Sequence, residues 1–200
     1  MKYLLYLVIC LLLLGCSTHN VSPGDKDYPV KNLNPKNFFL FHGTIDPSLD
    51  IKFKIRWDAM NPECKYMVSV LEGASNNFAA AEPLEISRSG NQFSVRVATD
   101  SVNPGRCGWM FGGITFYSTS STGYGQSLIQ TNSYPLRPEQ SPDSSIKLRC
   151  KLRPIPSVNP LGRGLVCQSL SKKEHGVVGT VVWWHPETKD VEVQFYQDKD

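Results

Sequence analysis

An alternation of apolar and polar side chains with a period of two constrains the fold of this chain more than any other feature. The alternation is clearest over residues 51–58, 93–97 and 191–195. Successive side chains of a β-strand point to opposite faces, so each segment predicts a strand with one buried face. Further strands are predicted over residues 37–42, 65–71, 108–117, 146–152 and 177–184, and only residues 75–81 look helical.

These predicted strands are separated by short turn signals such as Asn61-Pro62 and Asn103-Pro104-Gly105. A strand with one apolar face must cover that face with another sheet. Many short strands with almost no helix therefore predict an all-β fold. We expect an antiparallel β-sandwich, immunoglobulin-like or similar, over residues 36–200.

The N-terminus predicts export and lipidation. Lys2 precedes a run of mostly apolar residues that ends at Leu14, which is shorter than the ~20 residues needed to span a bilayer. The sequence Leu13-Leu14-Gly15-Cys16 resembles the lipobox of bacterial lipoproteins. The resemblance implies a cleaved signal peptide over residues 1–15 and a diacylglycerol and a fatty acyl group such as palmitate on Cys16. Ser17, rather than Asp, implies the outer membrane, with the domain facing the periplasm.

The segment that follows the lipidation site is predicted to be a flexible tether over residues 16–35. It is polar, contains Pro23, Gly24, Pro29 and Pro35, and shows no hydrophobic periodicity. The whole chain has a formal net charge of +3, and the loss of Lys2 with the signal peptide leaves +2. This balance gives no reason to expect nucleic acid as a partner.

Four cysteines remain for the mature domain, namely Cys64, Cys107, Cys150 and Cys167. An even number in an exported chain predicts two disulfides. By strand parity, Cys64, Cys107 and Cys150 lie on the same strand faces as apolar residues. Cys167 follows a Pro- and Gly-rich loop over residues 153–164, which a disulfide to Cys150 would close. We therefore predict the pairs Cys64–Cys107 and Cys150–Cys167. Metal binding by the same four residues is the weaker alternative, because the chain has no C-x-x-C pair.

A basic stripe is predicted on the outer face of the strand over residues 146–152, consisting of Lys147, Arg149, Lys151 and Arg153. Between residues 144 and 173 the chain has seven basic residues and no acidic ones. The stripe fits a docking surface for an acidic protein or for lipid headgroups. The alternative is an edge strand whose charges prevent aggregation between sheets.

Two further residues are candidate contacts for a protein partner. Tyr124 lies between two glycines in the Gly- and Ser-rich segment 117–126, which is typical of a mobile loop that presents an anchor. Arg106 lies in the segment Pro104-Gly105-Arg106-Cys107-Gly108-Trp109. Tight inhibition of a partner depends on a cluster of buried aromatic or Arg residues, which makes this Arg a candidate.

No catalytic motif supports an enzyme. The chain has no G-x-S-x-G, H-E-x-x-H, phosphate-binding loop or G-x-G-x-x-G sequence. His175 and His185, with Glu174 or Asp190, form a conceivable metal site, but the polar ends of a strand explain them better. We expect no catalytic residues, no metal and no cofactor.

The lipobox, the all-β pattern and the segment at 104–109 together resemble small outer-membrane lipoproteins that accompany type VI secretion lipase effectors as immunity proteins. The resemblance implies a membrane-anchored β-domain that binds an incoming phospholipase and blocks its active site or its approach to the membrane. Two alternatives are a structural or assembly lipoprotein of an envelope complex and a lysozyme-type inhibitor. Each of these would also act by binding.

Overall fold

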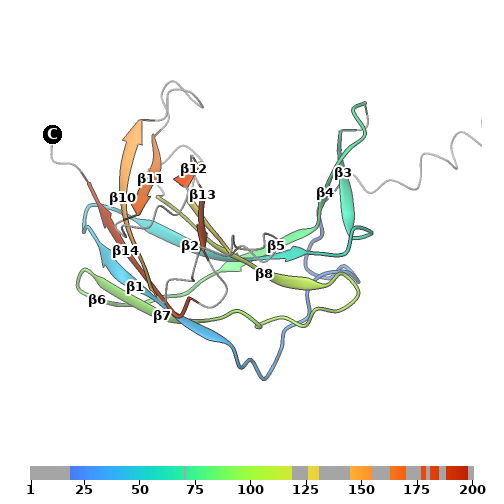
Figure 1. Ribbon diagram of the computed structural model, residues 1–200, viewed down its shortest axis with the longest axis horizontal. Helices are drawn as coiled ribbons and strands as arrows, with labels where there is room; N and C mark the ends of the chain where they lie inside the picture. Colours follow the sequence, from blue (N-terminus) through green and yellow to red (C-terminus); the bar gives the residue numbers. More distant parts are fainter. Residues whose placement is uncertain are drawn as a thin grey trace, which may run out of the picture.

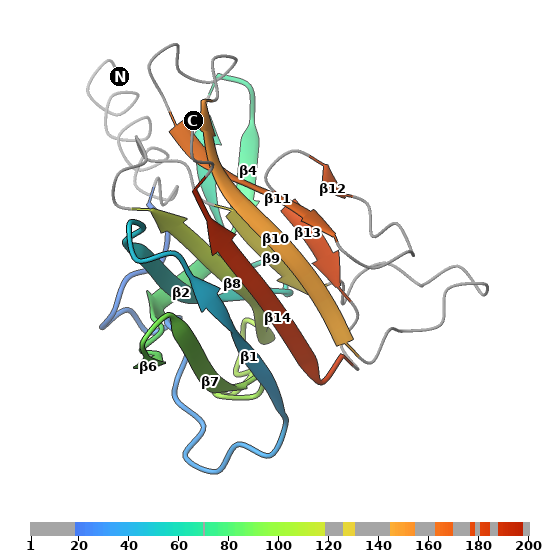
Figure 2. The same ribbon diagram turned by 90° about the vertical axis from the view of Figure 1, so that its left-hand side faces the viewer.

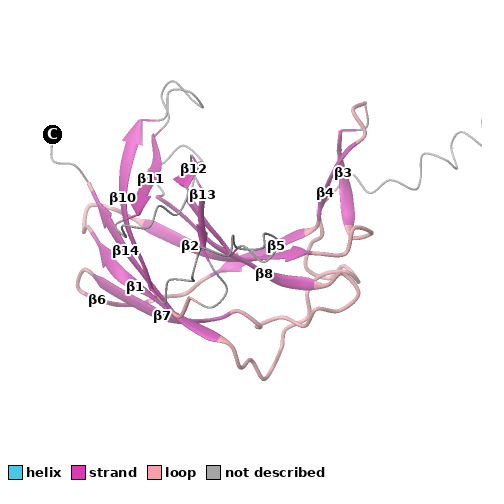
Figure 3. Ribbon diagram, viewed as in Figure 1, coloured by secondary structure: helices cyan, strands magenta, loops and turns pink. Residues whose placement is uncertain are grey.

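A computed structural model describes residues 19–69, 71–118, 126–130, 145–154, 163–169, 177–178, 181–184 and 188–197. The described chain consists of strands, turns and loops without a helix (Figure 3). The prediction of an all-β fold with two disulfides is therefore confirmed. Within these residues, no helix has the length and apolar character needed to cross a membrane.

The strands form two large sheets and a separate hairpin (Figure 1). The order in the first sheet is β11 (Arg163–Ser169), β10 (Ser145–Pro154), β14 (Asp190–Tyr196), β1 (Phe38–Ile45), β7 (Gln92–Ala98) and β6 (Ser87–Ser89). The order in the second is β12 (Val177–Val178), β13 (Val181–Trp184), β9 (Gln126–Gln130), β8 (Trp109–Ser118), β2 (Ile51–Ala59) and β5 (Ala79–Pro83). The hairpin pairs β3 (Lys65–Ser69) with β4 (Ala74–Asn77) and projects from the sheets.

The sheets contain both parallel and antiparallel pairs, so the prediction of a purely antiparallel arrangement is wrong. β14 runs parallel to both of its neighbours, β1 and β10, and β13 runs parallel to β9. Parallel neighbours need long crossovers instead of tight turns. Local turn signals could not reveal these pairs, because the partners lie far apart in the sequence.

The two large sheets share one hydrophobic core. Its centre is an aromatic cluster in which Phe53 of β2 contacts three rings of the first sheet, those of Phe41, Phe93 and Phe195, at centroid distances of 5.5, 5.3 and 5.8 Å. Large rings that meet edge-on or tilted bury much apolar surface and add favourable ring contacts. The predicted strand parity is confirmed here, because every second residue of β2 from Ile51 to Ala59 is buried.

The segment predicted to be a flexible tether makes specific contacts with the strands from Asn20 onward. The Asn20 side chain donates to Ala79 O at 2.6 Å and accepts from Ala79 N at 3.0 Å. Further along, Asn32 N donates to Ser101 O at 2.8 Å, and Pro29 is buried. The polar composition that predicted a tether instead supplies hydrogen-bonding groups that hold residues 20–32 on the domain.

Candidate partner-binding surface

The outer face of β10 carries the basic residues that the sequence places there. Lys147 and Arg149 are exposed and Lys151 is half-buried, whereas the alternate residues Leu148 and Cys150 are completely buried. Arg153 also belongs to β10, but its side chain lies outside the described part of the chain. Tyr124 and the predicted lipidation site Cys16 also lie outside the described residues.

β10 is an interior strand, with β11 on one side and β14 on the other (Figure 2). The alternative interpretation of the basic stripe, as an edge strand protected by charge, is therefore wrong. An interior strand has both rows of backbone groups paired and needs no protection against edge pairing. The basic residues therefore require another explanation, which depends on what lies beside them.

The neighbouring strand β14 balances part of the basic charge. Lys147 lies opposite Glu192 in the parallel register, and the Lys147 Nζ to Glu192 Oε2 distance is 2.8 Å. The hydrogen bond from Lys147 lowers the pKa of Glu192, and the same contact raises the pKa of Lys147. One cation of the stripe is thus paired within the sheet.

The other two described cations both lie near one aromatic ring. Tyr196 of β14 lies directly opposite Lys151, and Arg149 is two residues earlier on β10. The Arg149 guanidinium carbon and the Lys151 Nζ each lie 5.8 Å from the centroid of the Tyr196 ring. Such distances allow a cation–π attraction that orders long side chains. We call Arg149, Lys151 and Tyr196 the cation–tyrosine cluster.

A histidine and a carboxylate lie on the other side of Glu192. His42 Nε2 of β1 is 3.0 Å from Asp190 Oδ1 of β14, and both side chains are partly exposed. A base held by a carboxylate is the orienting half of a hydrolase triad. Ser94 of β7 lies opposite His42 in the register, but within the described contacts no hydrogen bond joins their side chains. Ser94 therefore does not extend the His42–Asp190 pair to a hydrolase triad.

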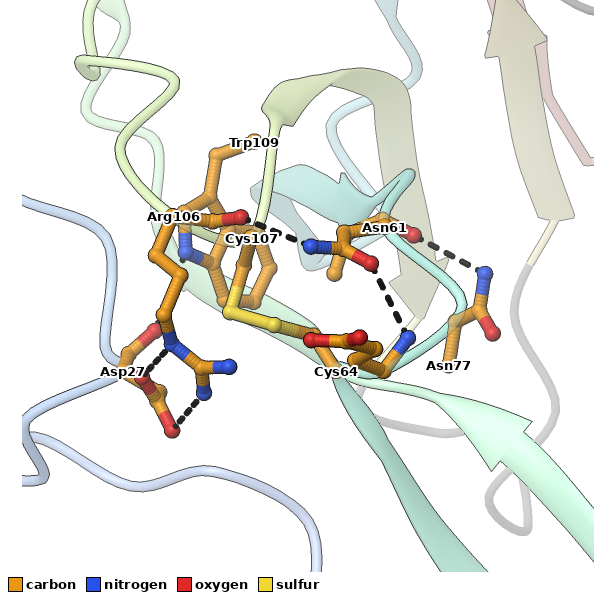
Figure 4. Close-up of a disulfide and its surroundings, with 9 residues drawn as sticks. Asp27, Asn61, Cys64, Asn77, Arg106, Cys107 and Trp109 are labelled. Carbon is orange, nitrogen blue, oxygen red and sulfur yellow. Dashed lines mark hydrogen bonds and ion pairs between the residues drawn. A yellow bond between two sulfur atoms is a disulfide. The ribbon is translucent and has the colours of Figure 1, made fainter.

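Arg106 is used to hold the chain together and does not join the cation–tyrosine cluster. It precedes β8 of the second sheet, and its guanidinium binds the Asp27 carboxylate at 3.1 Å and 2.6 Å (Figure 4). The Trp109 indole N–H donates to Asp27 O at 3.0 Å. The hydrogen bond from Arg106 lowers the pKa of Asp27. Together these contacts fasten the N-terminal segment to the loop that leads into β8.

The Cys64–Cys107 disulfide lies in this same loop region, with the Cα atoms 5.5 Å apart (Figure 4). Asn61 reinforces it by donating from its side chain to Arg106 O at 3.0 Å. The second disulfide joins Cys150 of β10 to Cys167 of β11. Both predicted pairings are thus confirmed. In the described ranges, no group of three or more His, Cys, Asp or Glu residues is arranged to hold a metal ion.

Sequence reasoning missed Glu192, Tyr196 and the His42–Asp190 pair as parts of this surface. Strand parity contained a usable signal for the first two, because Val191, Val193 and Phe195 are inward-facing and their neighbours must face outward. Their proximity to β10 could not be predicted, because strand order is not a local property. Comparisons of the chain with protein-family profiles, curated proteins and solved structures give no match.

Proposed function

We propose that this protein is a lipid-anchored binding protein of the outer membrane that faces the periplasm and grips an acidic surface of a protein partner. The observation that carries the proposal is the cation–tyrosine cluster on the outer face of β10 and β14. On this proposal the protein inhibits or holds its partner and catalyses no reaction. The two packed sheets support classification as a β-sandwich, which provides a rigid platform for such a surface.

The composition of the cluster suits protein recognition. Tyr and Arg are enriched among the residues that dominate binding energies at interfaces, and a ring already in contact with two cations loses little freedom on binding. Lys147 is paired with Glu192, whereas Arg149 and Lys151 both lie against the Tyr196 ring. A partner with carboxylates opposite these two residues would be steered toward the sheet and oriented on it.

The resemblance to immunity lipoproteins of type VI secretion lipase effectors names the candidate partner class. A lipase works at a membrane surface, and an inhibitor tethered to that membrane meets it at a raised effective concentration. Binding across the outer face of the first sheet would block the active site of the lipase or its approach to lipid. Cys16 supplies the anchor in this proposal.

The test is binding and protection with a type VI lipase effector encoded beside this gene. The variant Arg149→Glu with Lys151→Glu should weaken binding at least about tenfold, since each charged anchor contributes on the order of 1 kcal/mol or more. The matched control is Lys52→Glu with Lys54→Glu on β2 of the other sheet, where Lys54 lies 5.6 Å from the Tyr117 ring. The control makes the same charge change and should leave binding unchanged.

Three outcomes would count against the proposal. Equal loss of binding in both variants would show a response to net charge alone. Wild-type protein that neither binds the lipase nor protects cells expressing it in the periplasm would remove the immunity assignment. Inhibition of lysozyme, or stable co-purification with envelope machinery without protection, would favour one of the two alternative functions instead.

A further inference from the structure

The β3–β4 hairpin projects from the two large sheets and carries apolar side chains near its tip (Figure 1). Leu71, in the turn between the two strands, is 99% exposed, and Val68 near the end of β3 is 57% exposed. Val68 lies at the register shift between Met67 and Ser69. Single exposed apolar residues are common on protein surfaces, but two at the tip of one projecting hairpin indicate a contact site.

The base of the hairpin is fixed, so its direction relative to the sheets is set. Cys64, immediately before β3, forms the disulfide with Cys107 (Figure 4). Phe78 N donates to Cys64 O at 2.9 Å, and the Asn77 side chain donates to Ala59 O of β2 at 3.0 Å. A two-stranded hairpin on its own is marginally stable in water. These contacts hold it at the base and leave the tip exposed.

The N-terminal segment joins the domain close to the same base. The Asn20 side chain bonds the backbone of Ala79, two residues after β4 ends at Asn77. Cys16 lies four residues before Asn20, and Ala74, the residue of β4 nearest the tip, lies five residues before Ala79. An extended chain and a strand rise by similar amounts per residue. A lipid on Cys16 and the tip of the hairpin can therefore reach one bilayer surface together.

We infer that the tip of the β3–β4 hairpin inserts into the surface of the bilayer to which the chain is anchored. This inference rests on the proposed lipid anchor and concerns a different surface from the cation–tyrosine cluster. Protein interfaces bury their apolar anchors in packed pockets enclosed by a rim, and a narrow projecting turn provides no such rim. A bilayer accepts an apolar tip without a complementary surface. Leu71 and Val68 therefore suit contact with lipid better than contact with protein.

Two features limit the depth of insertion. Among the described strands, β3 and β4 pair only with each other, so their outer edges present backbone groups that need water or headgroups as partners. Glu72, directly after Leu71, is exposed and carries a carboxylate. The tip therefore reaches the boundary between headgroups and acyl chains, about 5–10 Å deep, and not the centre of the bilayer.

The test places a fluorescent reporter at the tip with the variant Leu71→Trp. The protein is expressed from the full-length chain, purified from membranes and reconstituted into vesicles of phosphatidylethanolamine and phosphatidylglycerol. Part of the phospholipid carries bromine on its acyl chains, which quenches tryptophan emission on contact. The emission of the wild type, which has four tryptophans, is subtracted. The emission of the introduced indole should shift to shorter wavelength and be quenched.

The matched control for the reporter is Leu33→Trp. Leu33 is 95% exposed and belongs to the segment before β1, which lies well away from the hairpin in both views (Figure 1, Figure 2). The introduced indole at this position should be neither shifted nor quenched.

A second variant tests whether the apolar side chains drive insertion. Val68→Asp, combined with Leu71→Trp, should lower the ratio of quenched to unquenched tips about tenfold, because it removes an apolar side chain from the bilayer and adds a charge. The matched control is Val30→Asp with Leu71→Trp, since Val30 is 68% exposed on the N-terminal segment. It makes the same replacement and should leave the quenching unchanged.

Flotation of the wild-type chain with the vesicles on a density gradient reports the anchor separately. A chain that floats but whose indole at the tip is quenched no more than that of Leu33→Trp would overturn the inference and leave the anchor in place. A shift to shorter wavelength without quenching would show that protein, such as a second copy, covers the tip. Equal loss with Val68→Asp and Val30→Asp would show a response to net charge. A wild-type chain that does not float would remove the anchor and the inference with it.

Discussion

Cys150 and Cys167 lie directly opposite each other in the β10–β11 ladder, with their Cα atoms 4.0 Å apart. Their disulfide therefore joins the strand that carries the basic stripe to the edge strand of its sheet. In the chain-entropy account, such a bond stabilises the fold by restricting the unfolded chain, and its effect grows with the length of the closed loop.

Replacing both Cys150 and Cys167 by Ala should lower the free energy of unfolding by about 3 kcal/mol, the value expected for a loop of this size. Urea denaturation followed by circular dichroism measures the loss. The same double replacement at Cys64 and Cys107, whose separation is 43 residues, should cost somewhat more. A smaller loss for the longer loop would contradict the entropic explanation.

The ion pair of Asp27 and Arg106 predicts a pH dependence of stability. The hydrogen bond from Arg106 lowers the pKa of Asp27 in the folded protein. A carboxyl group with a lowered folded pKa stabilises the fold above its unfolded pKa, about 4, and the contribution disappears as the pH falls through the folded value. Asp27→Asn should therefore be less stable than wild type at pH 7, and the difference should shrink toward pH 2.

Thermal unfolding between pH 7 and pH 2 measures this convergence. Asp50→Asn is the control, because the Asp50 carboxylate pairs with Lys52 at 3.3 Å where both side chains are more than half exposed. Exposed pairs of this kind contribute little to stability. A difference between wild type and Asp27→Asn that stays constant across the pH range would contradict the ion-pair explanation.

Gly43 is required where β1 and β14 meet. Its φ is +154°, and a Cβ atom at this position would collide with the backbone carbonyl oxygen of Val193. Gly43→Ala must therefore push apart two paired strands, and we expect a loss of more than about 2 kcal/mol in the free energy of unfolding. The control is Gly73→Ala, where φ is +64° but no atom lies within 4 Å, so only the conformational cost of about 1 kcal/mol applies. Equal losses in urea denaturation would show that the close approach to Val193 is unimportant.

Glu192 restrains the positive charge of the candidate binding surface, so its neutralisation should strengthen binding of an acidic partner. Glu192→Gln releases Lys147 from its 2.8 Å ion pair. We expect the association rate to rise about two- to tenfold at low salt and the gain to vanish at high salt, where charges are screened. Surface plasmon resonance at two ionic strengths measures both effects. Glu63→Gln, which changes the same charge at an exposed position before β3, is the control. It should leave the association rate unchanged at both ionic strengths.

Local features of the fold were predictable because strand parity depends only on neighbouring residues. The alternation over residues 51–58 predicted β2, which spans Ile51–Ala59, and parity also indicated that Cys150 faces the core. The helix predicted over residues 75–81 is wrong, since β4 and β5 occupy this region. A helix of two turns is marginal, and the pairing of β5 with β2 supplies long-range hydrogen bonds that override local propensity.

The arrangement of the candidate surface could not be predicted from the sequence. His42 and Asp190 are 148 residues apart in the chain, and they meet only because β14 lies beside β1. The pairing of Lys147 with Glu192 depends on the same strand order. Parity indicated which side chains point outward, but the choice of neighbouring strands decides which cations are neutralised.

Two hydrogen bonds between the Asn20 side chain and Ala79 hold residue 20 against β5, so under the proposed lipidation of Cys16 only residues 16–20 would link the domain to the membrane. Only four peptide units separate Asn20 from Cys16, and a fully extended chain of that length spans about 14 Å. With a lipid on Cys16, as proposed, the end of the domain near Ala79 would stay within this distance of the bilayer surface. A partner would then be intercepted in a thin layer at the membrane surface rather than throughout the periplasm.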